Sequence, residues 1–372
     1  MNNRISYIFL LVFAVACKEQ EQTPAQPGPN DPVISKAIPV PDMVPVNSGG
    51  DPYFQVTDEI ISPQGPFTIT RSALQDKNGD MWFATWQGIV RYDGKMFTNV
   101  TLKENLVRWH AFTLLQDSKY NIWIGMIGGG VYRYDGKTYE LFTSANGLVN
   151  DMVECIMEDH FGNIWFGTEF GVSCYNGRTF NNFTTENGLC ENSVNSIVED
   201  SNGKIWIATR GGVSCYDGEK FSNFLAANGK PFSNVRSMIE DRNGRIWIGG
   251  SDGLVRYTPT TTAPVSVSSS YTTFSNNFIG YIHEDKAGNL LLSEGGPTGM
   301  SLRKIDHASA QSAPTPFTTL YANDAGQQFM NQVFGIMEDK DGRIWFGTAT
   351  GVMRFDPVTK EVEDFAVNSY KD

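Results

Sequence analysis

Histidines and cysteines are the side chains that most often hold metals or act as nucleophiles, and this sequence has few of them. It contains four histidines, and none stands in a metal-binding spacing such as H-x-x-x-H or H-E-x-x-H. Neither a G-x-S-x-G nucleophile motif nor a phosphate- or dinucleotide-binding glycine motif is present. The sequence therefore predicts no catalytic residues, no metal site and no cofactor. His160, in a turn, and His307, in a loop, are expected to be solvated.

Two acidic segments, 76–79 (DKNG) and 339–342 (DKDG), resemble the start of a calcium-binding loop. The bidentate glutamate expected at position 12 of such a loop is absent. Similar Asp-x-x-Gly segments recur along the chain, which indicates hairpin turns instead of ion sites. Adjacent carboxylates such as Glu199 and Asp200 recur in the same way, so we interpret them as scaffold and not as a catalytic pair.

The turns belong to a longer repeat, Asp-x-x-Gly-x-x-Trp. Its tryptophan recurs every 41 to 54 residues, and a seventh copy at 285–291 has leucine instead; the six tryptophans are Trp82, Trp123, Trp165, Trp206, Trp247 and Trp345. A four-stranded propeller blade takes about 40–45 residues. The sequence therefore predicts an all-β fold, a single seven-bladed β-propeller of four-stranded blades.

Each repeat divides into four short strands. In the third repeat we expect them at 153–158, 164–168, 171–175 and 180–184, with the first strand innermost. Dipeptides such as Asp135-Gly136 suit a tight hairpin between the third and fourth strands. The strand tryptophans should be buried between neighbouring blades. We expect the sixth blade to be the least regular and residues 362–366 to supply the outer strand of the seventh.

These residues also carry a family resemblance. The segment 146–180 (NGLVNDMVECIMEDHFGNIWFGTEFGVSCYNGRTF) resembles the two-component regulator propeller repeat, and the resemblance covers about residues 65–367. It implies a relation to periplasmic sensor regions of hybrid histidine kinases, which bind oligosaccharides. No sandwich domain, membrane helix or kinase follows within the sequence, so we expect any signal to pass through another protein.

Candidate binding residues are those that break the repeat where loops meet at the central channel. Aromatic side chains beside arginines and acids suit a sugar, whose C–H face stacks and whose hydroxyls form hydrogen bonds. Arg71, Glu154 and Arg236 each stand five residues before a turn aspartate, so they should occupy equivalent positions around the channel and favour a polar or anionic ligand. The candidates, expected to converge on one face, are Arg71, Trp86, Trp109, His110, Glu154, Glu169, Arg210 and Arg236.

The N-terminus has the pattern of an exported lipoprotein. Residues 1–16 contain an apolar run of twelve, too short to span a bilayer as a helix, and predict a signal peptide. The small residues before Cys17 resemble a lipobox, which predicts lipidation of Cys17. Residues 17–50 predict a flexible tether and residues 51–372 the propeller. We expect the protein in the outer membrane, facing the periplasm or the surface, with the lipid as its only membrane contact.

The remaining cysteines allow little pairing. Cys174 and Cys215 occupy equivalent positions in adjacent blades, too far apart for a disulfide, and are predicted to be buried thiols. Whether Cys155 and Cys190 form a disulfide is left open by the sequence. The net charge of −12 argues against a nucleic-acid partner.

Three functions are compatible with these observations. The first is a non-enzymatic ligand-binding or sensory lipoprotein, with a glycan fragment or another small polar molecule as ligand. The second is a protein–protein interaction scaffold with a partner in the cell envelope. The third is a propeller lyase or hydrolase.

Overall fold

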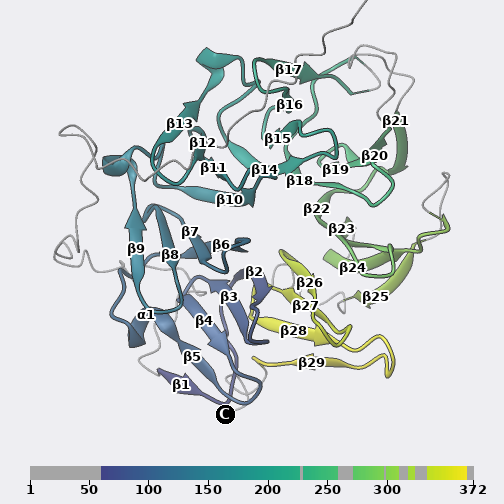
Figure 1. Ribbon diagram of the computed structural model, residues 1–372. Coiled ribbons are helices and arrows are strands. Elements are labelled where there is room, and N and C mark those ends of the chain that lie inside the picture. The colour runs from purple at the N-terminus through teal and green to yellow at the C-terminus, as the bar shows by residue number, and fades with distance from the viewer. Residues whose placement is uncertain are drawn as a thin grey trace, which may run out of the picture. The chain divides into compact units, whose positions relative to one another are not determined.

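Seven antiparallel β-sheets form a ring in the computed structural model, which describes residues 60–226, 229–258, 271–296, 299–309, 317–322 and 333–366. Figure 1 shows each sheet as one blade, with its first strand nearest the centre. The innermost strands contact one another in sequence, and β2 of blade one contacts β26 of blade seven, which closes the ring. The predicted fold is confirmed. The predicted signal peptide, Cys17 and the tether lie outside the described residues.

The first four blades follow one pattern. Blade one is β2 (Thr70–Gln75), β3 (Met81–Thr85), β4 (Gly88–Tyr92) and β5 (Phe97–Asn99), extended by β1 (Ile61–Ser62) and followed by α1 (Val100–Lys103). Blade two is β6 (Ala111–Gln116), β7 (Ile122–Met126), β8 (Val131–Tyr134) and β9 (Tyr139–Phe142). Blade three is β10 (Val153–Glu158), β11 (Ile164–Thr168), β12 (Gly171–Tyr175) and β13 (Phe180–Phe183). Blade four is β14 (Val194–Glu199), β15 (Ile205–Thr209), β16 (Val213–Tyr216) and β17 (Phe221–Phe224).

The last three blades complete the ring. Blade five is β18 (Val235–Glu240), β19 (Ile246–Gly250), β20 (Gly253–Tyr257) and β21 (Tyr271–Ser275). Blade six is β22 (Ile279–Glu284), β23 (Leu290–Gly296), β24 (Gly299–Ile305) and β25 (Thr318–Ala322), and its two middle strands are the longest described. Blade seven is β26 (Ile336–Glu338), β27 (Ile344–Gly347), β28 (Val352–Phe355) and β29 (Val362–Asp364), the last being the predicted outer strand. Short 3₁₀ turns at Ser144–Asn146 and Thr185–Asn187 follow blades two and three.

The repeat motif is explained by one hydrogen-bonding unit. In blade four, Asp200 Oδ1 accepts the backbone N–H of Asn202 and Lys204, and Oδ2 accepts the indole Nε1–H of Trp206 at 2.9 Å. The same aspartate–tryptophan bond occurs in six blades at 2.7–3.0 Å. Both carboxylate oxygens are thereby satisfied within the turn, which accounts for the calcium-like spacing without an ion.

In six blades the side chain before the turn aspartate links neighbouring blades; it is a glutamate in five of them and Gln75 in blade one. Glu240 of blade five accepts the backbone N–H of Ser201 in blade four at 3.0 Å, and Glu199 accepts that of His160 at 2.7 Å. Equivalent bonds join blades two and three, five and six, six and seven, and seven and one. We call these bonds the interblade latches. The expectation that His160 is solvated is therefore wrong, since its ring is only half-exposed and its Nδ1 contacts Glu199.

All four cysteines in the described ranges are free thiols, so Cys155 and Cys190 are not paired. Cys190 instead lies 3.4 Å from the hydroxyl of Thr209. Burial raises the pKa of Cys215 to about 12, as expected for an apolar environment. The prediction that Cys174 is a buried thiol is wrong, since this residue is only partly buried. It packs at the margin of a hydrophobic cluster between blades three and four.

Candidate functional site

One equivalent position faces the centre in each blade; it lies in the innermost strand of blades one to six and two residues before β26 in blade seven. In the first six blades the pairing with the second strand shifts by one residue at this position, as a β-bulge or similar irregularity. Such an extra residue redirects a side chain out of the regular pleat. Taken in ring order, these channel residues are Arg71, Phe112, Glu154, Asn195, Arg236, Gly280 and Phe334.

A cavity of about 450 Å³ opens at the start of these strands. Seven of the eight candidate residues line it, joined by three apolar side chains; the lining is Arg71, Trp86, His110, Phe112, Ile127, Met152, Glu154, Glu169, Arg210 and Arg236. The predicted equivalence of Arg71, Glu154 and Arg236 agrees with this lining. That these residues bind a ligand stays a prediction.

Trp109 is the candidate that does not line the cavity. Its indole packs on the loop between β7 and β8, where a Cβ added to Gly129 would lie only 2.4 Å from the ring. Gly128 has a φ of +93° and a similarly close approach. Because the two glycines have no side chains, the indole of Trp109 packs directly on their backbone, outside the cavity wall, and 44% of the residue is exposed.

Arg71 is held between aromatic rings from both neighbouring blades. Its Cζ lies 4.2 Å from the ring centre of Phe112 in blade two and 4.3 Å from that of Phe334 in blade seven. Within the described residues its guanidinium has no hydrogen bond or ion pair. Burial, followed by the charge of Arg236, lowers the pKa of Arg71 to about 9, so it remains a cation at neutral pH.

Arg210 pairs with both acids of the cavity. Its Nη1 donates to Glu169 at 2.9 Å and its Nη2 to Glu154 at 3.2 Å. Ser193 donates a further hydrogen bond to Glu169 at 3.0 Å. The Glu154 side chain is 8% exposed, and burial, with a hydrogen bond to Glu169, raises its pKa although Arg210 opposes that shift. A proton shared in this cluster is therefore held more tightly than by a solvated glutamate.

Arg236 spans two blades through a neutral partner. Its Nη1 donates to Asn195 Oδ1 at 3.1 Å, and Asn195 in turn donates to the backbone carbonyl of Val235 at 2.7 Å. Burial lowers the pKa of Arg236, and the nearby charge of Glu154 partly opposes the shift. The side chain is thus positioned by hydrogen bonds without being neutralised by a direct ion pair.

Trp86 and His110 form an aromatic platform at the cavity. Their rings are parallel within 3° and their centres lie 4.9 Å apart. Trp86 comes from the loop between β3 and β4, and His110 directly precedes β6. A stacked pair of this kind offers a rigid flat surface to a ligand.

Three apolar wall residues, Phe112, Ile127 and Met152, were not among the eight candidates. Phe112 could have been found, because it stands five residues before the turn aspartate of its repeat, as Arg71 does. Met152 carries no such signal. It lines the cavity because its bridge with Ile127 brings the loops of blades two and three together.

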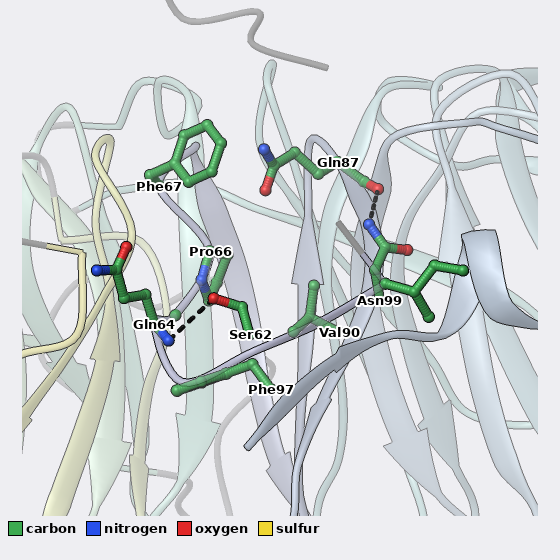
Figure 2. A pocket seen from close by; sticks show the side chains of 10 residues that line it. Ser62, Gln64, Pro66, Phe67, Gln87, Val90, Phe97 and Asn99 are labelled. Atoms are coloured by element: carbon green, nitrogen blue, oxygen red, sulfur yellow. Dashed lines mark hydrogen bonds between the residues drawn. The ribbon is translucent and has the colours of Figure 1, made fainter. Parts of the chain in front are cut away.

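The described residues offer little other site chemistry. They include no group of three or more His, Cys, Asp or Glu side chains that could hold a metal. A second hollow, lined by the loop between β1 and β2 and by residues of β4 and β5 in blade one, measures about 50 Å³ (Figure 2). There Gln64 N–H donates to the Ser62 hydroxyl and Asn99 to the Gln87 carbonyl. This volume suits a few waters and no organic ligand.

The geometry defines a seven-bladed β-propeller with a charged channel cavity, and the comparisons agree with this class. Four segments match the two component regulator propeller model, at 147–170, 188–211, 229–252 and 329–350. These four segments therefore resemble two component regulator propeller repeats, as the sequence motif indicated. No curated protein sequence matches the chain.

Solved structures show the same fold. The extracellular domain of BT3049 from B. thetaiotaomicron, described as a hybrid two component system, is 25% identical, with a TM-score of 0.63 over 79% of this chain and 39% of that one. That of BT4673 from the same organism is 23% identical, with a TM-score of 0.62 over 80% and 39%. Virginiamycin B lyase from Staphylococcus aureus is 14% identical, with a TM-score of 0.56 over 81% and 96%.

These similarities have different weight. The chain spans about two fifths of the length of the two sensor domains. The similarity to the lyase lies below 25% identity and shows the fold alone. The matched repeats and the solved extracellular domains together support the propeller fold. Among the described residues, no helix has the length and apolar character needed to cross a membrane.

Proposed function

We propose that this chain is a non-enzymatic ligand-binding propeller with a sensory role, and that the channel cavity takes a small polar ligand such as a glycan fragment. The observation that carries the proposal is the convergence of seven sequence-selected residues on one cavity of about 450 Å³. Small-molecule sites commonly have volumes of about 300–1,000 Å³ and a few directed polar groups on apolar walls.

The wall chemistry supports a sugar. The Trp86–His110 platform offers an aromatic face for the C–H side of a pyranose ring. Arg236 and the Arg210–Glu169 pair supply donors and acceptors that sugar hydroxyls can join. These polar groups are already held by neighbouring blades, so little ordering is needed on binding.

A glycan-array screen of the purified chain, followed by calorimetry on any hit, tests the proposal. We expect Trp86→Ala to weaken glycan binding at least tenfold. Phe161→Ala is the matched control, since Phe161 is an aromatic residue 78% exposed in the turn between β10 and β11. Equal binding by the two variants would place the glycan elsewhere and contradict the proposal.

A protein partner is the second candidate. Phe170, in the loop between β11 and β12, is 57% exposed, and Trp109 is 44% exposed. Exposed aromatic residues of this kind are enriched at protein interfaces. With a purified envelope partner, Trp109→Ala and Phe170→Ala would reduce partner binding, and Trp86→Ala would not.

We further propose that the protein is exported and anchored to the outer membrane through a lipid on Cys17. The proposal rests on the apolar run and the small residues before that cysteine. Metabolic labelling with palmitate should mark the wild-type chain and not Cys17→Ala. Equal labelling of both would refute the anchor and leave the binding proposal intact.

A further inference from the structure

We propose that the deep part of the cavity is a carboxylate-binding subsite in which Arg71, assisted by Arg236, binds the acidic group of a sugar acid. This inference rests on the proposed function, because it names the class of ligand that the same cavity takes. Its basis is the arrangement of Arg71 between two rings and the charge balance of the wall.

Within the part of the chain that the structure describes, the Arg71 guanidinium donates to no protein acceptor. A guanidinium carries five N–H donors in one plane and no acceptor. The rings of Phe112 and Phe334 flank it from blades two and seven, and neither ring supplies an oxygen. With both flanks covered, the donors are available only toward the channel cavity that Arg71 lines. A planar carboxylate is the acceptor that matches two parallel N–H donors.

The charges of the wall also favour an anion. Of the three arginines, Arg210 is paired with both Glu154 and Glu169. Arg236 has a neutral direct partner in Asn195, and Arg71 forms no ion pair with an acid in the described ranges. The cavity therefore carries an excess of positive charge within a chain of net charge −12.

An uncompensated buried cation is costly, and a bound anion relieves that cost. The attraction is strong because Arg71 is largely removed from water. The aromatic platform of Trp86 and His110 lines the same cavity, so one ligand could stack its ring there and direct a carboxylate to Arg71. A hexuronic acid combines these two features in one molecule.

Acetate, galacturonate and galactose are the probes, with affinities measured by calorimetry and by NMR line broadening of the probe. We expect saturable acetate binding to the wild-type chain and at least about tenfold weaker binding to Arg71→Met. Methionine suits this position, because a thioether packs favourably between aromatic rings. Arg178→Met is the matched control, since Arg178 is exposed in the hairpin between β12 and β13.

Sulfate competition on the wild-type chain requires no variant and covers the case in which Arg71→Met does not fold. We expect sulfate to displace acetate, and Arg71→Lys, which keeps the charge without the planar fork, to retain intermediate affinity. Galacturonate should bind at least tenfold more tightly than galactose. Sulfate binding with no acetate binding would overturn the carboxylate subsite in favour of a tetrahedral anion.

The inference and the proposed function can fail separately. Equal affinities for galactose and galacturonate, unchanged in Arg71→Met, would overturn the subsite and leave a glycan-binding cavity. Saturable acetate binding that depends on Arg71, with no sugar bound by the chain, would support the subsite and refute the glycan proposal. Absence of binding by all probes to a folded wild-type chain would refute both.

Discussion

Replacement of Trp206 tests whether the repeat motif is held together by its aspartate–tryptophan hydrogen bond. Trp206 is 2% exposed, and its ring centre lies 4.4 Å from that of Phe224 and 5.5 Å from that of Tyr257. Truncation of a buried aromatic residue to alanine costs about 3–5 kcal/mol. We therefore expect Trp206→Ala to lower the free energy of unfolding by that amount.

Part of this cost comes from the carboxylate left behind. The indole donates to Asp200 Oδ2, and a hydrogen bond to a charged group contributes about 1.5–3 kcal/mol. Blade six has no tryptophan and keeps an asparagine bond to the turn aspartate, which blades two and three form in addition to the indole bond. In blade six Leu291 takes the position, and Asn289, two residues earlier, donates its Nδ2 to Asp285 Oδ2 at 2.8 Å.

Blade four can be converted to the blade-six arrangement by two changes. Trp206→Leu removes the donor, and Lys204→Asn places an amide at the position equivalent to Asn289. We expect Lys204→Asn to restore about 1–2 kcal/mol in the Trp206→Leu background and to change the wild-type chain by less than about 0.5 kcal/mol. The coupling follows from a double-mutant cycle of urea unfolding curves followed by circular dichroism.

Two results would refute this reasoning. If the coupling between the two sites is below about 0.5 kcal/mol, the hydrogen bond to Asp200 does not contribute as proposed. If Trp206→Ala costs less than about 1 kcal/mol, the indole is not a core residue in solution. His160→Ala is a control, since the backbone N–H of residue 160 keeps the latch to Glu199. This variant should lower the free energy of unfolding by less than about 1 kcal/mol.

Three further outcomes follow from the structure. Glu240→Ala should lower the urea midpoint more than Ser201→Ala does, because the first removes the whole latch between blades four and five and the second keeps its backbone N–H; equal shifts would contradict the latch. Since the pKa of Glu154 is raised in the folded state, its protonated form stabilises the fold below the unfolded pKa, and this contribution is lost as the pH rises through the folded pKa. Glu154→Gln should therefore flatten the pH dependence of the thermal midpoint. An unchanged pH profile would refute this reasoning. Arg236→Ala should lower the free energy of unfolding by only about 0.5–1.5 kcal/mol, the contribution of its hydrogen bond to Asn195, and should weaken ligand affinity in calorimetry. A larger loss of stability with unchanged affinity would give Arg236 a structural role alone.

Much of the fold is readable from the repeat. The spacing of the turn aspartates and tryptophans predicts seven blades, because each unit satisfies its own turn and buries its own indole. The position five residues before the turn aspartate also predicts which side chains line the channel. Arg71, Glu154 and Arg236 could be placed there from register alone, since equivalent residues of a repeat occupy equivalent positions.

Other features depend on contacts that no single repeat contains. The position of Trp109 is decided by the two glycines of another loop, which let the indole lie flat on the backbone. The latch that engages His160 is formed by the next blade, so the residue cannot be interpreted from its own turn. Cys174 is partly exposed because its place at the margin of a cluster depends on how two blades meet.

The chain by itself determines the blades, their order and the residues that face the channel, because these follow from hydrogen bonds and hydrophobic periodicity within about 40 residues. Closure of the ring decides which side chains those residues contact. Arg71 lies between Phe112 and Phe334 only because the first blade meets the seventh, more than 260 residues away in sequence. Arg210 of blade four reaches Glu154 and Glu169 of blade three, which pairs one arginine, whereas Arg71 forms no ion pair among the described residues. Long-range electrostatics of this kind depends on distances between blades, and only the tertiary structure sets them.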